Sequence, residues 1–253
     1  MKQSTELTTY EKEYASMILK LDETVGIILD ELQQLGIDDN TMIVFTSDNG
    51  HEVYYRQEGR TTGRQNNLNG ERLDDITSKF YSETCGDVFN GNDGMGGLKF
   101  SNWEGGTRVP YLVRFPGTIT PNTESNHMLA NYDFMPTLAE LLGIEMPQDK
   151  DGVSYLPTLL EQPDAQQSHE WIVYASRLGP ALVNSDGWKL RYINQLDSFQ
   201  LYHLLSDYRE ENDVSSEHPD IVSRLSQWML NACDGDYHNG TPQAHLAEIP
   251  NRN

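Results

Sequence analysis

The chain has 253 residues, of which 37% are hydrophobic and 23% charged, and its formal net charge is -21 at pH 7. This composition is typical of a globular protein with one large domain, or with one domain and a small appendage. The acidic balance argues against a nucleic-acid-binding protein, because a phosphate backbone needs clusters of lysine and arginine and this chain has no basic run. An anionic substrate would therefore need a local positive site.

The sequence shows no pattern of a membrane protein or a disulfide-rich protein. No apolar run approaches the roughly 20 residues of a membrane span. Residues 1–14 are polar and lack the apolar stretch of a secretory signal, so we expect no signal in this chain. Cys85 and Cys233 are too few for a disulfide framework or a paired-cysteine zinc site. We expect one free thiol in a loop and one near a helix end.

A helix followed by a strand is predicted near the start of the chain. Gly36 ends the helix, and residues 41–46 form a β-branched and apolar run that predicts a short strand buried on both faces. A helix, a short loop and a buried strand together are half of a right-handed α/β crossover. The helix is predicted from apolar residues at helical spacing, namely Tyr14, Met17, Ile18, Leu21, Val25, Ile28, Leu29 and Leu32.

Polar residues follow the predicted strand at its carboxyl end, where ligands bind in open α/β sheets. Asp48 and Asn49 offer a carboxylate and an amide oxygen side by side, which are hard donors suited to Ca²⁺ or Mg²⁺. Asn49 with Gly50 is also a hairpin turn signal, and the residues alone leave the metal site and the turn equally open. His51 could hydrogen-bond a substrate or leaving group, or be an ordinary loop histidine.

Residues 56–97 are rich in glycine, asparagine and aspartate and are too many for an ordinary connection. We interpret this stretch as a functional insertion or lid. Lys99 comes next, between a cluster of glycines and the sequence Trp103-Glu104-Gly105-Gly106. Its ammonium group suits an oxyanion, and glycines let the backbone approach a ligand closely. A solvated surface lysine is the alternative.

The next predicted elements are a second buried strand at residues 111–115 and a helix at residues 134–142. Asp133 is a natural N-cap for that helix, and Gly143 ends it.

The pattern changes after about residue 162, where short strands separated by turn residues predict an antiparallel meander. A helix at residues 219–230 would lie on that sheet. We therefore expect an α/β portion at 1–160 and a small α+β subdomain at 161–253. The predicted strands are residues 171–174, 180–183, 188–193 and 199–202.

The order of these motifs resembles the carboxy-terminal half of the sulfatase family, within the alkaline-phosphatase-like superfamily. The resemblance implies an α/β fold with part of an alkaline-phosphatase-like sheet flanked by helices, then a carboxy-terminal antiparallel sheet with one packed helix. The matching segments are Asn40-Thr41-Met42-Ile43-Val44-Phe45-Thr46-Ser47-Asp48-Asn49-Gly50, Lys99 with Glu104-Gly105-Gly106-Thr107-Arg108-Val109-Pro110, Asp133-Phe134-Met135-Pro136-Thr137-Leu138, Asp151-Gly152-Val153-Ser154, Gly187-Trp188-Lys189-Leu190, and Leu201-Tyr202 with Asp207 and Glu210.

The resemblance also implies roles for individual residues. Asp48 and Asn49 are implied as ligands of Ca²⁺, with Mg²⁺ as an alternative. Lys99 is implied as the catalytic residue that contacts the sulfate group, and His51 as a second substrate-binding residue. Glu104 and Arg108 are expected to shape the loop. The family's nucleophile is a formylglycine made within a Cys/Ser-x-Pro-x-Arg motif, and this sequence contains no such motif.

We therefore expect a sulfatase fragment that binds metal poorly and hydrolyses nothing alone, since two ligands fall short of the roughly 6–8 oxygens of a Ca²⁺ shell. The complete enzyme would act on a sulfated small molecule or glycan and would be periplasmic or secreted. The alternatives are another hydrolase of the superfamily, such as a phosphodiesterase, and a non-catalytic remnant that binds a partner. Unpaired strand edges would favour oligomers.

Overall fold

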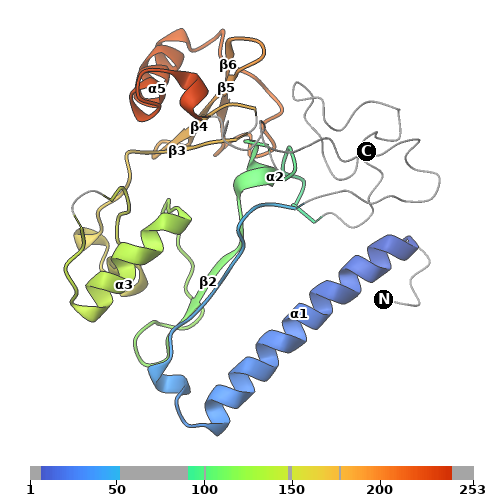
Figure 1. Ribbon diagram of the computed structural model, residues 1–253, viewed down its shortest axis with the longest axis vertical. Helices are drawn as coiled ribbons and strands as arrows, with labels where there is room; N and C mark the ends of the chain where they lie inside the picture. Colours follow the sequence, from blue (N-terminus) through green and yellow to red (C-terminus); the bar gives the residue numbers. More distant parts are fainter. Residues whose placement is uncertain (1–6, 52–90, 100, 148–149, 177, 241–253) are drawn as a thin grey trace, which may run out of the picture.

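The computed structural model of the chain describes residues 7–51, 91–99, 101–147, 150–176 and 178–240. Figure 1 shows two groups of elements in these ranges: a two-stranded sheet with helices beside it, and a four-stranded sheet that carries one helix. None of the helices in these ranges combines the length and the apolar character that crossing a bilayer requires.

Helix α1 spans Thr9–Gln34 and begins earlier than its apolar pattern predicts. A capping box sets its start: Thr8 Oγ1 accepts the backbone N–H of Glu11 at 3.3 Å, and Glu11 Oε2 accepts the N–H of Thr8 at 2.8 Å. The apolar stripe of α1 remains largely uncovered by the described residues. Met17 is 65% exposed and Leu21 is 51% exposed.

Strand β1 spans Ile43–Thr46 and pairs with β2, Tyr111–Arg114, in an antiparallel sheet of two strands. A 3-10 turn at Asp38–Asn40 links α1 to β1. The prediction that β1 is buried on both faces is wrong for the described chain, because its first three residues are half-buried and Thr46 is exposed. The physical reason is that the described elements cover the two faces only in part: a groove separates β1 from the helix Phe134–Leu142, and the apolar stripe of α1 stays exposed.

Helix α3, Phe134–Leu142, lies on one side of this sheet, and α1 stands on the other side (Figure 1). Both ends of α3 agree with the sequence prediction. Gly143 terminates the helix with a φ of 64°, a left-handed conformation that glycine adopts without steric cost.

Asp133 precedes α3 but does not cap it as predicted. Its carboxylate instead accepts the backbone N–H of Ala130 at 2.7 Å and that of Val153 at 2.9 Å, and it lies 2.8 Å from Nε2 of His169. The reason is local: Asn131–Asp133 form a 3-10 turn, so the side chain reaches backward to the start of that turn. The buried carboxylate therefore ties three segments together.

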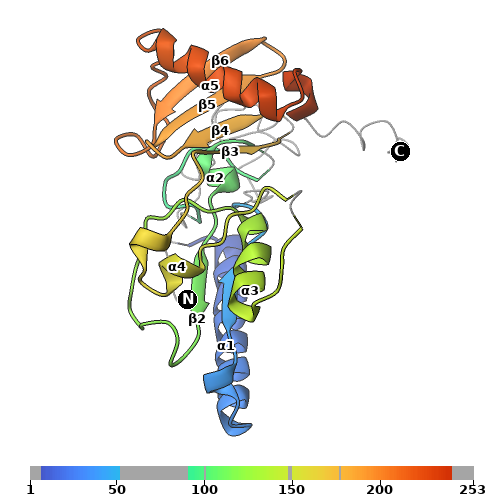
Figure 2. The same cartoon turned by 90° about the vertical axis from the view of Figure 1, so that its left-hand side faces the viewer.

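The carboxy-terminal sheet has its four strands in chain order, which confirms the predicted meander. Its strands are β3 Trp171–Tyr174, β4 Ala181–Asn184, β5 Trp188–Ile193 and β6 Ser198–His203. Helix α5, Pro219–Ala232, lies across one face of this sheet (Figure 2). The core between them consists of Leu182, Leu190, Tyr192, Leu201, Leu225, Met229 and Cys233.

Shorter elements complete the described chain. Helix α2, Glu104–Thr107, lies beneath the sheet on the side away from α5 (Figure 2). The others are α4 Leu156–Leu159 and the 3-10 turns Pro163–Ala165 and Tyr237–Gly240. Cys233 is the buried C-cap of α5, near a helix end as expected, and Cys85 lies outside the described residues. The domain boundary near residue 160 stays a prediction.

Candidate functional site

The polar segment after β1 is an irregular strand end, and it is not a two-residue hairpin turn. Ser47 Oγ donates to the carbonyl oxygen of Asn49 at 3.0 Å, and Asn49 Nδ2 donates to that of Gly50 at 3.1 Å. The strand that pairs with β1 is β2, which comes some sixty residues later, so the hairpin interpretation of Asn49 and Gly50 is wrong. Asp48 is exposed and Asn49 is half-buried.

Two backbone hydrogen bonds join this strand end to the loop that carries the predicted sulfate-binding lysine. The N–H of Gly50 donates to the carbonyl oxygen of Gly106 at 3.0 Å. The N–H of Lys99 donates to that of His51 at 2.9 Å. The structure therefore brings the backbones of all four predicted site residues, Asp48, Asn49, His51 and Lys99, into one cluster of loops.

Glycine is required where these loops cross. A Cβ atom on Gly50 would lie 1.9 Å from the carbonyl oxygen of Gly105, and one on Gly105 would lie 2.3 Å from that of Gly97. These approaches are far shorter than any real contact, so a side chain at either position would force the segments apart. The glycine cluster on both sides of Lys99 thus has a packing role.

His51 is held by a side chain from α1. The hydroxyl of Tyr14 lies 3.1 Å from Nδ1 of His51, and the two ring centroids are 5.2 Å apart. Gly91 lies against the imidazole, because a Cβ there would come within 2.7 Å of the ring. Burial lowers the pKa of His51, which favours the neutral imidazole at pH 7.

Behind the loops lies a buried group of charges centred on Lys189, in β5. Its Nζ is 2.8 Å from Oε1 of Glu104 and 3.0 Å from Oε1 of Glu210. Glu104 Oε2 also accepts from Nε of Arg108 at 2.7 Å. Lys189 and Glu210 are fully buried and Glu104 is 5% exposed, so the group is closed to solvent except at Arg108. We call Glu104, Lys189 and Glu210 the charge triad.

Burial and charge oppose each other within the triad. Burial alone would raise the pKa of Glu104, but Lys189 and Arg108 hold that pKa below its usual value. Burial raises the pKa of Glu210 in spite of the nearby ammonium group. Burial would lower the pKa of Lys189, but the two carboxylates raise it above its usual value. Glu104 is therefore the carboxylate that most firmly carries charge.

A second link joins β5 to the same loop. Arg191 Nε donates to Oδ1 of Asn102 at 2.7 Å, and its guanidinium carbon lies 3.1 Å from the ring centroid of Trp103. Asn102 Nδ2 donates in turn to the carbonyl oxygen of Gly179 at 3.0 Å. Burial lowers the pKa of Arg191 to about 10. The face of β5 opposite α5 thus holds the start of the α2 loop.

Sequence reasoning did not assign a role to Lys189, Arg191 or Glu210. A signal was present, because alternate residues of a strand point to opposite faces. Leu190 and Tyr192 face α5, which places the two basic residues together on the other, equally buried face. Basic side chains on a covered face of a strand indicate buried acidic partners nearby.

The predicted metal ligands fit Ca²⁺ in chemistry but are too few. Asp48 and Asn49 supply hard oxygen donors, whereas Ca²⁺ takes roughly 6–8 oxygens. Among the described residues, no group of three or more His, Cys, Asp or Glu side chains could hold a metal ion. Further ligands would have to come from outside the described part. The metal and lysine roles stay predictions, and most of the predicted lid at 56–97 lies outside the described residues.

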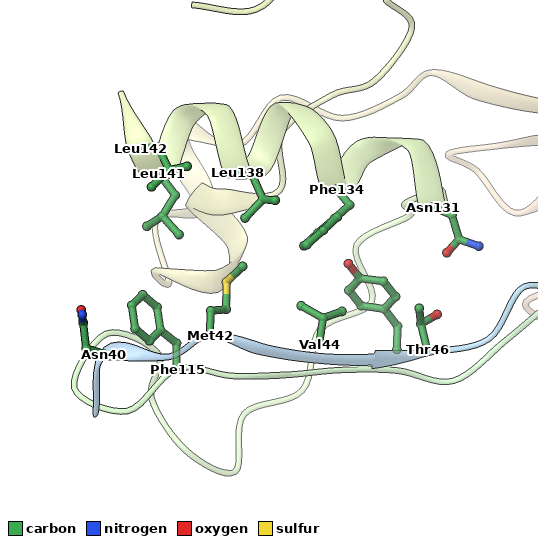
Figure 3. Close-up of a pocket in the computed structure, with 11 residues that line it drawn as sticks. Asn40, Met42, Val44, Thr46, Phe115, Asn131, Phe134, Leu138, Leu141 and Leu142 are labelled. Atoms are coloured by element: carbon green, nitrogen blue, oxygen red, sulfur yellow. The ribbon is translucent and has the colours of Figure 1, made fainter. Parts of the chain in front are cut away.

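An apolar groove of about 880 Å³ runs between α3 and the two-stranded sheet. Figure 3 shows Phe134 and Leu138 of α3 facing Met42 and Val44 across it. The groove follows the length of β1 and contains neither predicted ligand nor Lys99. It is therefore separate from the loop cluster at the strand end.

Comparison with known proteins agrees with this arrangement. The family model named Sulfatase matches residues 3–144, and a model of the carboxy-terminal part of N-sulphoglucosamine sulphohydrolase matches residues 99–233. The chain is 31% identical over 234 residues to N-acetylgalactosamine-6-O-sulfatase of Bacteroides thetaiotaomicron, covering 84% of this chain and 40% of that protein. It is 34% identical over 164 residues to steryl-sulfatase of Rattus norvegicus, covering 64% of this chain and 24% of that protein.

A solved structure shows the same fold. It comes from work on the metabolism of multiple glycosaminoglycans by Bacteroides thetaiotaomicron, has 30% identity and a TM-score of 0.60, and is matched over 85% of this chain and 43% of its own. The fold is therefore of the alkaline-phosphatase-like class. The chain belongs to the sulfatase family, because the family model matches more than half of it. It spans about 40% of the length of the N-acetylgalactosamine-6-O-sulfatase and matches the carboxy-terminal part.

Proposed function

We propose that this chain forms the carboxy-terminal part of a sulfatase that hydrolyses sulfate esters on sulfated glycans. The observation that carries the proposal is the loop cluster at the end of β1. Two backbone hydrogen bonds, of 3.0 Å and 2.9 Å, hold the segment of Asp48 and Asn49 against the loop of Lys99. Two oxygen donors next to a lysine on a glycine-packed loop suit a metal-assisted reaction of an oxyanion.

Each of the four predicted site residues has a role in the proposed reaction. Lys99 would place its ammonium group on a sulfuryl oxygen and stabilise the negative charge there as the sulfur–oxygen bond breaks. Asp48 and Asn49 would supply two oxygens to a Ca²⁺ ion, which would draw charge from the sulfate group when bound. His51, favoured in its neutral form by burial, would hydrogen-bond the substrate.

A sulfated glycan is the substrate class that the longer matches favour. The relative aligned over 84% of this chain is an N-acetylgalactosamine-6-O-sulfatase, and one aligned over 92% is an N-acetylglucosamine-6-O-sulfatase. The steryl-sulfatase match covers 64%.

The proposal includes catalytic incompleteness of these 253 residues. The sequence has no Cys/Ser-x-Pro-x-Arg motif from which a formylglycine nucleophile could arise. The described residues also leave the metal shell unfilled. Nucleophile and remaining ligands would come from polypeptide that corresponds to the other part of the relatives' length, and the complete enzyme would be periplasmic or secreted.

The test compares two proteins on the same substrates. One is this chain, and the other is expressed from the same DNA with the in-frame coding sequence upstream of Met1 included. We expect the longer protein to release sulfate from N-acetylgalactosamine 6-sulfate and this chain to show no turnover. Lys99→Ala should lower kcat/KM of the longer protein about 100-fold. The matched control is Lys150→Ala at an exposed lysine, which should leave kcat/KM unchanged.

Three outcomes would contradict the proposal. Turnover by this chain, abolished by Lys99→Ala, would show that it is catalytically complete. Preference for a phosphodiester over the sulfate ester would favour the phosphodiesterase alternative. An upstream sequence without the nucleophile motif, together with an inactive product, would favour a non-catalytic binding protein.

A further inference from the structure

The charge triad is the largest group of buried charges among the described residues that the proposed reaction does not use. Lys189 comes from β5, Glu104 from the start of α2, and Glu210 from the turn after β6. Three distant segments of sequence therefore meet at one ammonium group, with nitrogen–oxygen distances of 2.8 and 3.0 Å.

Stability alone is a poor explanation for this group. Removing an ion from water costs several kcal/mol even after relaxation, and apolar residues of the same volume often hold a fold at least as well. Buried charges add geometric specificity, because the carboxylate and the ammonium group must lie at hydrogen-bonding distance from each other. The triad therefore specifies where the start of α2 lies with respect to β5.

Glu104 is held at both its backbone and its side chain. Its N–H donates to Oε2 of Glu210 at 2.7 Å. Its two carboxylate oxygens face different cations, Oε1 facing Lys189 and Oε2 facing Arg108. These contacts define both the position and the rotation of the first residue of α2.

From Glu104 the constraint passes through the next two glycines to the site. The N–H of Gly105 donates to the carbonyl oxygen of Gly96 at 2.8 Å, in the loop that leads to Lys99. The carbonyl oxygen of Gly106 accepts the N–H of Gly50 at 3.0 Å, at the strand end. Because these glycines have no side chains, the backbones pack directly against each other at the crossings, so a shift of one segment moves the next.

We propose that Glu104 is a positioning residue, which uses Lys189 and Glu210 to hold the loop of Lys99 and the Asp48–Asn49 strand end at a defined separation. The value of that separation for catalysis rests on the proposed function. The contacts that hold these two segments lie within this chain. The carboxy-terminal sheet thereby sets the geometry of a site that lies outside that sheet.

The experiment follows amide hydrogen exchange by NMR in this chain and in its Glu104→Gln variant. The amide keeps the shape of the side chain, but whichever way it turns, its NH₂ group faces a cation. Lys189 and Glu210 remain as a balanced pair, which favours folding of the variant. We expect the N–H groups of Gly50, Lys99 and Gly105 to exchange about tenfold faster.

Two controls separate positioning from general destabilisation. The N–H of Tyr192, which donates to the carbonyl oxygen of Pro180 at 3.0 Å within the carboxy-terminal sheet, should keep its exchange rate. Glu211→Gln makes the same chemical change at an exposed carboxylate next to Glu210, and should change none of these rates.

A second variant tests the proposal if Glu104→Gln folds poorly. Glu104→Gln combined with Lys189→Met removes both charges and leaves Glu210, whose protonated form burial already favours, with the N–H of residue 104 as its hydrogen-bond donor. The same three N–H groups should again exchange about tenfold faster. Unchanged rates at Gly50, Lys99 and Gly105 in a folded variant would overturn the proposal, as would equal acceleration at Tyr192. Neither readout involves metal or substrate, so failure here is distinct from failure of the proposed function.

Discussion

The hydroxyl oxygen of Tyr14 lies 3.1 Å from Nδ1 of His51, which joins the first turns of α1 to the segment that follows β1. This contact orients the imidazole, and burial lowers its pKa. The folded chain therefore binds a proton at His51 less readily than the unfolded chain does. Its contribution to stability is present above a pH of about 6.5 and is lost as the pH falls through the folded pKa.

We predict that His51 titrates below the ordinary histidine range in the folded chain. NMR of its ring protons against pH measures this directly. His51→Gln should flatten the dependence of the free energy of unfolding on pH just below about 6.5. Because burial is the cause, Tyr14→Phe should leave the pKa of His51 low. Titration of His51 above about 6.5 would contradict the assignment.

Glycine packing at the loop crossing gives a second prediction. A Cβ atom on Gly105 would lie 2.3 Å from a carbonyl oxygen, so Gly105→Ala should lower the free energy of unfolding by about 1–3 kcal/mol. Gly26 is the matched control, because it lies within α1 with nothing within 4 Å of its Cβ position. Gly26→Ala should be stabilising, by up to about 1 kcal/mol. Urea unfolding followed by circular dichroism measures both, and an equal effect of the two variants would contradict the prediction.

Lys189→Met tests the cost of breaking the charge triad at its centre. The substitution leaves Glu104 with only Arg108 and removes the ammonium group that Glu210 faces, and it should destabilise the chain by about 3–5 kcal/mol. Lys20→Met is the control, since its pair with Glu23 is exposed and should contribute less than about 1 kcal/mol. The midpoints of urea unfolding compare the two. Wild-type stability of Lys189→Met would show that the triad is not closed to water.

Metal binding gives a fourth prediction. Ca²⁺ added to this chain should shift the NMR signals of Asn49 and Gly50 with a dissociation constant weaker than micromolar, because most ligands are missing. Asp48→Ala should abolish these shifts with little change in stability, since Asp48 is exposed. Asp164→Ala, at another exposed aspartate, should leave the shifts in place. Tight binding, or shifts that survive Asp48→Ala, would place the metal site elsewhere.

The exposed stripe of α1 predicts self-association of this chain. Leu21 is 51% and Ile28 is 52% exposed, and Leu112 on β2 is 61% exposed. Size-exclusion chromatography with light scattering should show oligomers whose mass rises with concentration. Leu21→Lys with Ile28→Lys should reduce them, whereas Leu205→Lys, at a single apolar residue that is 79% exposed, should not. A monomer at every concentration would contradict the prediction.

Local patterns predicted the elements well. The four strands of the meander and both ends of α3 follow from alternation and from turn residues, which act within a few positions of each other. The prediction that β1 is buried on both faces was wrong because burial depends on which distant elements cover those faces. The prediction that Asp133 caps α3 was wrong because its carboxylate contacts groups outside the helix, the N–H of Ala130 and the ring of His169.

The residues of the candidate site could be predicted from the sequence, but the contacts that hold their segments together could not. Asp48 and Lys99 follow from motif and order, while the links between their segments are backbone hydrogen bonds of Gly50, Gly105 and Gly106, which leave no side-chain signature. The sequence placed the charge of Lys189 in a predicted strand, but it could not pair that charge with Glu104, which lies 85 positions away.

The contact of Gly91 with the imidazole of His51 places two residues that are far apart in sequence at one point of the fold. The N–H of Lys99 donates to His51 at the same point, so the strand end and the lysine loop are held together directly, by contacts that do not involve residues 52–90.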